Sequence, residues 1–301
     1  MRADFNEQYG EYLNCFNSYL CEYIENTEKS LTGKGERLML EAMKYSLDAG
    51  GKRIRPVFAM AFCRACGADY KNALPMALAA EMLHTYSLIH DDLPCMDNDD
   101  LRRGKPSSHI KFGYANALLA GDSLLTLSFE ILSDGEKDAD KALKCVRELS
   151  RLAGFRGMIA GQAEDLINEG EGDITLSQIT AAETLKTACL IESACVMGCI
   201  AADADEDMLK AARQFANYYG LGFQLRDDLL DVIKTSEQLG KPAGSDLKQG
   251  KNNFITFLGK NGVCEKMDYL KEKALEEIKI FGDNGEFIRQ MINATMDWRK
   301  L

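Results

Sequence analysis

The sequence predicts an all-α protein that consists of one large domain, residues 1–301. Only five of the 301 residues are proline, and residues that favour helices (Ala, Leu, Met, Glu and Lys) are abundant. Segments with the alternating β-branched residues that mark strands are scarce. No linker rich in Pro, Gly or Ser and no low-complexity tract interrupts the chain. We therefore expect helices nearly throughout, packed into a single unit.

The first helix that the sequence defines in detail covers Leu38–Asp48 and leads into a basic turn. Gly50 and Gly51 stop this helix and expose backbone N–H groups. The segment Lys52–Arg55 then adds three positive side chains within four residues. Such a turn either binds an anion through its amides and cations together or is simply solvated.

A second helix is expected over the apolar stretch Ala77–Ile89, which leads into the aspartate-rich sequence Asp91–Asp97. Carboxylates packed this densely raise one another's pKa values unless a cation lies between them, and a hard divalent metal suits that place. Asp97 falls about 120° from Asp91 on an ideal helix. The two side chains can converge only if the helix ends or bends near Pro94.

One face of this second helix carries further polar residues. His84, Ser87 and Asp91 occupy positions i, i+3 and i+7, which share a face. His84 is either a site residue or an ordinary packing residue. After the motif, Arg102 and Arg103 form a second basic cluster, which either neutralises the aspartates or binds an anion.

A third helix is expected over Phe215–Leu225, and it leads into the second aspartate-rich sequence, Asp227–Asp231. Gln224, Asp227 and Asp231 occupy i, i+3 and i+7 of one helix face, from which a metal ion can be bound. Two acidic motifs and two basic turns together favour a phosphate-containing ligand, because phosphate is bound by Arg and Lys and through bridging Mg2+.

The composition excludes several other classes of protein. The net charge of −11 at pH 7 argues against nucleic acid or an anionic membrane surface as a partner. The N-terminus lacks the apolar core of a secretory signal, and we expect no stretch of about 20 apolar residues that could span a membrane. The ten cysteines lie mostly in apolar helical stretches, so we expect reduced thiols and a cytoplasmic protein. The sequence shows no P-loop, no dinucleotide-binding glycine motif and no Ser-His-Asp or Cys-His arrangement.

Several segments match, in order and spacing, the motifs of one enzyme family: Gly51–Pro56, His90–Asp97, Leu101–Gly104, Gly121–Asp122, Gly161–Asp165, Lys186–Thr187, Phe223–Asp231 and Gly240–Lys241. On these segments, from about Glu41 to Leu258, the chain resembles the short-chain trans-polyprenyl diphosphate synthases of the bacterial farnesyl diphosphate synthase type. One departure is Asn253, because relatives typically have Thr two residues after the position of Lys251. Lys251 itself keeps its expected place.

The resemblance implies the isoprenoid synthase fold, a single bundle of about ten or more helices around a deep central cavity. It implies a Mg2+-dependent, homodimeric prenyltransferase that joins isopentenyl diphosphate head-to-tail to dimethylallyl and geranyl diphosphate. The products would be trans,trans-farnesyl diphosphate and pyrophosphate. A geranylgeranyl or geranyl diphosphate synthase is the alternative, and a terpene cyclase or a non-catalytic synthase subunit is a more distant one. The basic turn argues against a cyclase, which needs no isopentenyl site.

The resemblance also implies roles for individual residues. Three Mg2+ ions would be held by carboxylates: Asp91, Asp92, Asp97, Asp227 and Asp231. The allylic diphosphate site would be completed by Arg102, Lys186 and Lys241, with Lys251 as a further substrate-binding residue. Isopentenyl diphosphate would occupy a metal-free site made by Gly51, Lys52, Arg55, His84 and Arg103. Thr187 and Gln224 would line the place where a carbocation forms, and these two residues with Lys186 and Arg102 are the expected catalytic residues.

Product length in this family is implied to depend on bulk below the first aspartate motif, at Tyr86 and Ser87. Tyr86 lies five residues before Asp91 and is large enough to block a growing chain, so we expect a C15 product. The alternative is that Tyr86 is an ordinary interior aromatic residue. On an ideal helix it lies about 140° from Asp91, so the spacing alone does not place it in the pocket.

Overall fold

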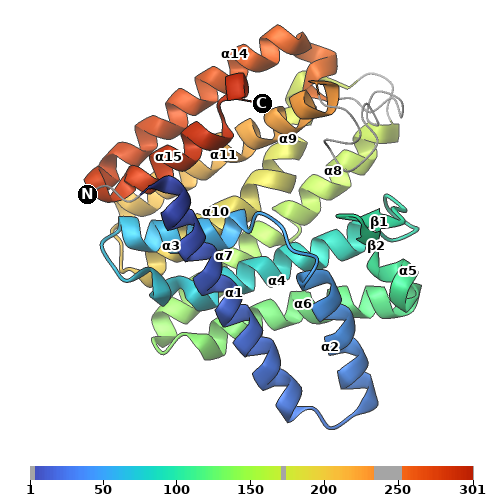
Figure 1. Ribbon diagram of the computed structural model, residues 1–301. Helices are drawn as coiled ribbons and strands as arrows, with labels where there is room; N and C mark the ends of the chain where they lie inside the picture. Colours follow the sequence, from blue (N-terminus) through green and yellow to red (C-terminus); the bar gives the residue numbers. More distant parts are fainter. Residues whose placement is uncertain (1–3, 171–173, 234–252, 301) are drawn as a thin grey trace.

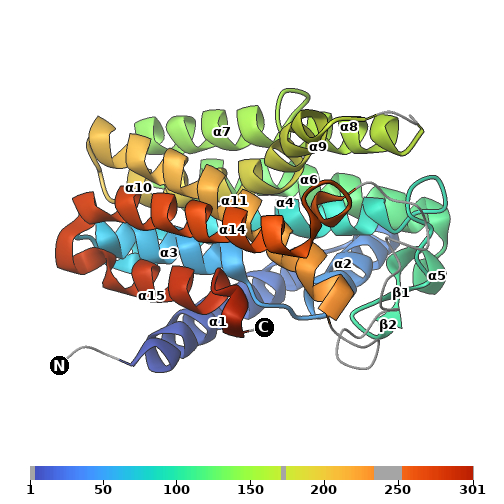
Figure 2. The same ribbon diagram turned by 90° about the horizontal axis from the view of Figure 1, so that it is seen from above.

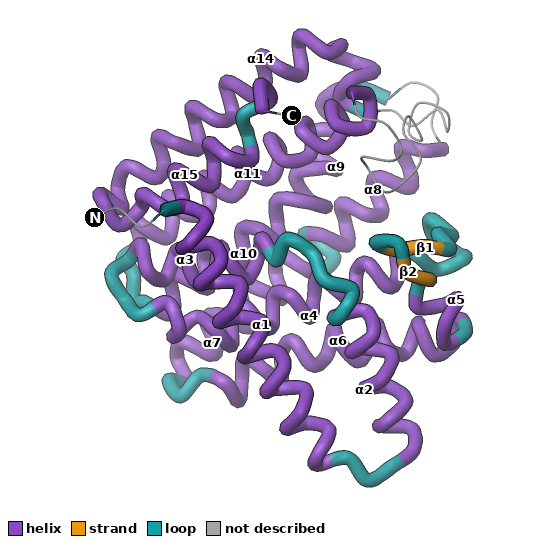
Figure 3. The backbone as a smooth tube through the Cα atoms, in the orientation of Figure 1, coloured by secondary structure: helices purple, strands orange, loops and turns teal. Residues whose placement is uncertain are grey.

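The computed structural model describes residues 4–170, 174–233 and 253–300. In these parts of the chain most residues belong to helices, which confirms the predicted all-α class (Figures 1 and 3). Most of the long helices run side by side in one bundle, and α1 and α2 form a hairpin that projects from it (Figures 1 and 2). The elements have these bounds: α1 Phe5–Ser30, α2 Lys34–Leu47, α3 Ile54–Ala65, η1 Tyr70–Ala73, α4 Leu74–Asp91, β1 Leu101–Arg102, β2 Lys105–Pro106, α5 Ser108–Phe112, α6 Tyr114–Gly135, α7 Ala139–Ala153, α8 Met158–Gly170, α9 Leu176–Glu183, η2 Thr184–Ala188, α10 Cys189–Ala201, α11 Glu206–Ile233, α14 Phe254–Glu277, η3 Ile278–Gly285, α15 Glu286–Thr295 and η4 Trp298–Lys300.

Each helix that the sequence predicts from an apolar stretch is present. The predicted helix Leu38–Asp48 corresponds to α2, whose last residue is Leu47 and whose C-cap is Asp48. The stretch Ala77–Ile89 lies within α4, and Phe215–Leu225 lies within α11. Both aspartate-rich sequences therefore begin at or near the end of a long helix.

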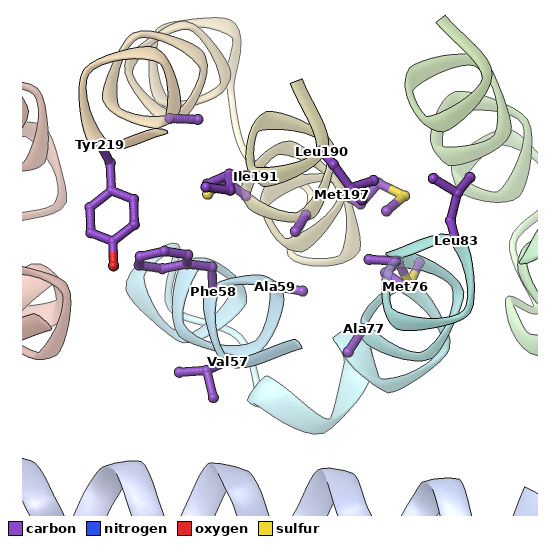
Figure 4. Close-up of a cluster of buried hydrophobic side chains, with 14 of the residues drawn as sticks. Val57, Phe58, Ala59, Met76, Ala77, Leu83, Leu190, Ile191, Met197 and Tyr219 are labelled. Atoms are coloured by element: carbon purple, nitrogen blue, oxygen red, sulfur yellow. The ribbon is translucent and has the colours of Figure 1, made fainter. Parts of the chain in front are cut away.

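The centre of the core is built by α3, α4, α10 and α11, whose apolar side chains point toward one another (Figure 4). Every residue of α10 is buried, as expected for a helix that is apolar on all sides. Phe58 on α3 packs edge-on against Tyr219 on α11, with 4.8 Å between the ring centroids. Burial of each large apolar side chain in such a core contributes roughly 1.5–3 kcal/mol. This packing fixes the helices whose ends carry the acidic motifs.

Two helical segments are long and apolar enough to cross a membrane by length and composition, so the prediction that none exists was wrong. The window in Leu176–Ala201 is 78% buried inside the bundle, as a core helix is. The window in Tyr114–Gly135, which is α6, is only 39% buried and leaves Leu118 and Leu119 exposed. The prediction of reduced thiols agrees with the structure, in which all ten cysteines are free.

Candidate active site

A cavity of about 1220 Å³ lies between the helices that carry the two aspartate-rich sequences. Asp91, at the end of α4, and Asp227, near the end of α11, both line it. Both helices end on the side of the bundle that carries the β1–β2 hairpin (Figures 1 and 2). The structure therefore brings the two acidic motifs to one cavity, as a shared metal cluster requires.

The lining of this cavity also contains apolar side chains. Helix α6 contributes Leu118 and Leu125, and α8 contributes Met158 and Leu166. A cavity that combines carboxylates and cations with such surfaces can bind a charged group and an apolar tail of the same ligand.

The surroundings of Asp91 disfavour the ionised form of its carboxyl group. Its pKa is raised to about 6, mainly by burial and also by the charges of Asp97 and Asp92, while Lys186 and Arg102 oppose the rise. Helix α4 ends at Asp91, before Pro94, and the Asp97 backbone N–H donates to the Asp91 carbonyl oxygen at 2.9 Å. The chain therefore folds back beside Asp91. The Asp97 side chain is exposed and is not among the described residues that line the cavity.

Asp92 faces a different partner from its neighbour. Its carboxylate is only 2% exposed and accepts hydrogen bonds from Arg102, whose Nε lies 2.9 Å from Oδ1 and 3.2 Å from Oδ2. Arg102 itself lines the cavity, whereas Asp92 is not among the described lining residues. In this geometry Asp92 fixes the guanidinium of Arg102.

The two basic clusters meet at the cavity wall. Arg103 and Gly104 occupy the turn of the β1–β2 hairpin, with φ angles of 53° and 75°, as a two-residue hairpin turn requires. The Arg103 guanidinium donates to the carbonyl oxygen of Gly50. Gly51 has φ 132°, and a Cβ at this position would lie 2.8 Å from the Arg103 guanidinium. Glycine is favoured here because this positive φ strains any other residue, and a side chain would also displace the Arg103 guanidinium.

Positive charge is held in this wall at a substantial electrostatic cost. Lys52, Arg55 and Arg103 line the cavity together with His84. The pKa of Arg55 is lowered to about 10, mainly by burial and also by the charge of Arg103, while Glu81 opposes both effects. The buried Arg55 Nε has no hydrogen-bond partner among the described residues. An anion bound here would offset the repulsion between Arg55 and Arg103 and would accept a hydrogen bond from the Arg55 Nε.

His84 is a neutral imidazole at physiological pH. Burial lowers its pKa well below the usual value, and the charges of Arg55 and Arg103 lower it further. Ser87 lies on the same face of α4, and its hydroxyl donates to the His84 carbonyl oxygen at 2.9 Å. Both side chains line the cavity, which agrees with the shared face predicted from their spacing.

Lys186, Thr187 and Gln224 also line the cavity, on the wall made by η2 and α11. Segment η2 is a π-helical turn, a local widening that is frequent at functional sites. The Lys186 ammonium lies 2.5 Å from Asp165 Oδ2 on α8. A Cβ at Gly161 would lie 2.2 Å from the Lys186 backbone nitrogen, so only glycine allows α8 to approach this closely. The Thr187 hydroxyl lies 3.5 Å from Gln224 Oε1.

The family model for polyprenyl synthetases matches residues 36–279. The chain belongs to the polyprenyl synthetase family. It is therefore a prenyltransferase of isoprenoid biosynthesis, as the resemblance of its motifs implied.

Relatives of this synthase include enzymes with different products. It is 42% identical over 268 residues to a farnesyl diphosphate synthase from Bacillus subtilis (strain 168), which covers 86% of this chain and 90% of that protein. It is 44% identical over 243 residues to a chloroplastic geranylgeranyl pyrophosphate synthase from Catharanthus roseus, with 80% and 68% covered. A geranyltransferase from Helicobacter pylori, solved in complex with magnesium and isoprenyl diphosphate, matches with a TM-score of 0.78, 33% identity and 96% of each chain covered.

The chemistry of the carboxylates in this synthase fits Mg2+. The raised pKa of Asp91 marks a carboxylate that a cation would stabilise. Both oxygens of Asp231 are buried without a hydrogen-bond partner among the described residues, although Asp231 is not among the described residues that line the cavity. In the described ranges, no three acidic, His or Cys side chains form a metal site by themselves. Mg2+ keeps several waters and is bound through one or two carboxylates together with substrate phosphates, so it does not need such a cluster.

Sequence reasoning about the synthase missed several residues of the cavity. Glu183 lines it and lies within 3.3 Å of the Thr187 hydroxyl. The pKa of Glu183 is raised to about 8, mainly by burial and next by the charge of Asp165. Buried Arg53 pairs with Glu81 at 2.5 Å, and both line the cavity. No local pattern in the sequence distinguishes Glu183 from a surface glutamate, because its burial and its charged neighbours come from other elements.

The two residues predicted to limit product length both line the cavity of the synthase. Tyr86 is 6% exposed, and its ring packs edge-on against His90 with 5.5 Å between centroids. Ser87 lines the cavity from the neighbouring position of α4. The cavity therefore contacts more of the α4 surface than the one helix face that carries His84 and Asp91. Of the other predicted site residues, Lys241 and Lys251 lie outside the described residues.

Proposed function

We propose that this synthase joins an allylic diphosphate head-to-tail to isopentenyl diphosphate and makes trans,trans-farnesyl diphosphate and pyrophosphate. One observation carries the proposal: Asp91 and Asp227 line the same cavity as the basic residues Lys52, Arg55 and Arg103. A terpene cyclase binds one diphosphate and needs no second cluster of cations. The similarity to the Bacillus subtilis farnesyl diphosphate synthase supports the same reaction here.

In the proposed reaction, Asp91 and Asp227 would hold Mg2+, which would bind the allylic diphosphate and supply positive charge to it as the leaving group. Lys186 and Arg102 line the same cavity and add positive charge. Asp165 and Asp92 hold these two cations in place, so they need little rearrangement during the reaction. Because negative charge grows as the C–O bond breaks, these cations stabilise the transition state more than the ground state.

The second substrate is proposed to bind without a metal, at Gly51, Lys52, Arg55, His84 and Arg103. The backbone at Gly51 and the guanidinium of Arg55 offer donors to its diphosphate. Neutral His84 can donate a hydrogen bond without adding further charge. The apolar part of the lining limits water near the allylic cation, so the isopentenyl double bond becomes its nucleophile. The final proton can leave with the departing diphosphate, so the reaction needs no dedicated protein base.

Three Mg2+ ions per site are proposed, with Asp91, Asp97 and Asp227 as ligands and with help from Asp92 and Asp231. The neighbouring structure from Helicobacter pylori, described as complexed with magnesium and isoprenyl diphosphate, supports the metal. Lys241 and Lys251 are proposed to bind substrate as well. Thr187 and Gln224 are proposed to face the developing carbocation, because both line the cavity beside Lys186.

The proposed product is C15, because the buried ring of Tyr86 and the side chain of Ser87 line the cavity one turn before Asp91. Geranylgeranyl diphosphate is the second candidate, and the 44% identity to the Catharanthus roseus enzyme favours it. Geranyl diphosphate would require a stop closer to the aspartates.

Further proposals concern assembly and location. A homodimer is proposed, and exposed apolar side chains of α6, such as Tyr114 and Leu119, offer a surface for it. One polyprenyl synthase domain over 1–301 is proposed, because buried residues from Tyr12 to Met296 belong to a single core cluster. A cytoplasmic location is proposed from the bacterial relatives, with no nucleic acid and no membrane as partners.

A direct assay tests the function. Purified protein receives Mg2+, isopentenyl diphosphate and one of three allylic substrates (dimethylallyl, geranyl or farnesyl diphosphate), and products are separated by chain length. We expect C15 diphosphate from the first two substrates and no activity after addition of EDTA. Cyclic hydrocarbons formed without consumption of isopentenyl diphosphate would contradict the proposal, and so would a well-folded protein without turnover.

A further inference from the structure

The second aspartate motif is divided between two environments. Asp227 lines the cavity, whereas Asp228 is not among the described lining residues and is 4% exposed. Asp228 Oδ1 accepts a hydrogen bond from Gln224 Nε2 at 3.0 Å, one helical turn earlier on α11. Asp228 Oδ2 accepts from the backbone N–H of Phe254 at 3.0 Å. The two oxygens of one carboxylate therefore join a cavity residue to the start of α14.

The hydrogen bond to Asp228 determines which way the Gln224 amide points. An ionised carboxylate only accepts hydrogen bonds, so the NH2 end of the amide must face Asp228. The carbonyl end then lies 3.5 Å from the Thr187 hydroxyl, on the cavity side. If the amide turned over, its positive NH2 end would face the cavity in place of the negative oxygen.

The hydrogen bond to Phe254 stabilises the beginning of α14. Phe254 is the first residue of this helix, and its N–H belongs to the first-turn donors that have no partner within a helix. The Asn253 side chain accepts from a second such donor, the N–H of Thr256, at 3.1 Å. A negative carboxylate at this end of a helix is also favoured by the helix dipole. Asp228 thus ties α14 to α11.

We propose that Asp228 is a positioning residue that orients Gln224 and anchors α14, and that it does not bind Mg2+. This role of Asp228 rests on the proposed function, because the amide of Gln224 faces a developing positive charge only if the protein catalyses prenyl transfer. A carbonyl oxygen held toward that charge stabilises it, provided that the amide cannot rotate. Asp228 therefore influences the reaction through Gln224, while Asp227 supplies the carboxylate that lines the cavity.

The test is a double-mutant cycle in the full chain, with kcat, KM for both substrates, the Mg2+ concentration for half activity and the melting temperature measured for each variant. Asp228→Asn keeps the shape of the side chain but leaves one oxygen for two donors. Asp207→Asn is the matched control, because it removes the same charge from an exposed position on α11. Asp227→Asn provides the behaviour expected of a metal ligand.

We expect Asp228→Asn to lower kcat by about 10- to 100-fold, as small displacements of a site residue do, with KM values and the Mg2+ requirement changed by less than about twofold. In a Gln224→Ala background the same substitution should lower kcat by less than about threefold. An equal loss in both backgrounds, or a tenfold higher Mg2+ requirement like that expected of Asp227→Asn, would overturn the proposal.

A second variant covers the case in which Asp228→Asn does not fold. Asp228→Glu keeps both acceptors but shifts them by one methylene group, so it should lower kcat and leave the Mg2+ requirement unchanged. A raised Mg2+ requirement in this variant would also contradict the proposal. The wild-type assay tests the proposed function separately, which fails if wild-type protein does not consume isopentenyl diphosphate. If the enzyme is active but the losses from Asp228→Asn and Gln224→Ala are additive, only the role of Asp228 is refuted.

Discussion

Glu183 is expected to destabilise the folded protein at neutral and alkaline pH, and Glu183→Gln should remove this penalty. The pKa of Glu183 rises from 4.5 to about 8, because of burial first and the charges of Asp165 and Asp228 next, while Lys186 and a hydrogen bond from Thr187 oppose the rise. Between these two values the folded state keeps a proton that the unfolded state releases. Stability therefore falls as pH rises from about 4.5 to about 8, and it levels off above that.

The size of the penalty follows from the pKa shift. At pH 7 the difference from 4.5 is 2.5 pKa units, or about 3.5 kcal/mol at about 1.4 kcal/mol per unit. Glu183 lines a wide cavity, where water screens the charge, so we expect roughly 1–3 kcal/mol. At about 2–4 °C per kcal/mol for a protein of this size, Glu183→Gln should raise the melting temperature by several degrees.

Thermal unfolding of substrate-free protein at pH 5, 7 and 8 measures this effect. The gain from Glu183→Gln should be small at pH 5 and should grow toward pH 8. Glu164→Gln is the control, because Glu164 is exposed on α8 and loses the same charge. If the gain is equal at pH 5 and pH 8, or if the variant melts earlier than wild type at pH 8, the pKa of Glu183 is not raised as argued.

Three further predictions concern product length, the isopentenyl site and the packing of α8. Tyr86→Ala should give products longer than C15, while Tyr86→Phe keeps the ring and the C15 length; unchanged products from a folded Tyr86→Ala variant would exclude this residue as the stop. Arg55→Met should raise KM for isopentenyl diphosphate by about 10- to 100-fold, as the loss of a charge-assisted hydrogen bond does, with KM for the allylic substrate unchanged. Equal changes in both KM values would argue against a separate site. Gly161→Ala should destabilise the protein by about 1–3 kcal/mol and lower kcat, because the new Cβ would lie 2.2 Å from the Lys186 backbone nitrogen. A melting temperature and a kcat equal to those of wild type would show that α8 does not pack this closely against η2.

Much of the fold and the composition of the cavity could be predicted from the sequence. Apolar stretches marked α4 and α11, and helical spacing correctly placed His84 and Ser87 on a cavity face. These features are local, because a helix of known period determines which of its residues share a side. The order and spacing of motifs then indicated that the two acidic ends meet.

Pairings that depend on how separate elements pack could not be predicted in the same way. Asp92 turns toward Arg102 because the chain reverses in the β1–β2 hairpin, and helical spacing says nothing about such a reversal. Glu183 resembles many surface glutamates in sequence, and its raised pKa arises only when α8, η2 and α11 enclose it. The period of a helix therefore predicts faces, whereas tertiary packing decides which charges those faces meet.

Arg102 and Arg103 are adjacent in the chain and both line the cavity, yet they bind different partners. Arg102 donates hydrogen bonds to Asp92 in the first aspartate motif, and Arg103 donates to the carbonyl oxygen of Gly50 in the basic turn. Because the hairpin is short, a movement of its backbone displaces both arginines together. A ligand that fixes the hairpin backbone through one arginine therefore preorganises the other, so each substrate should tighten the binding of the other, by the same factor in both directions.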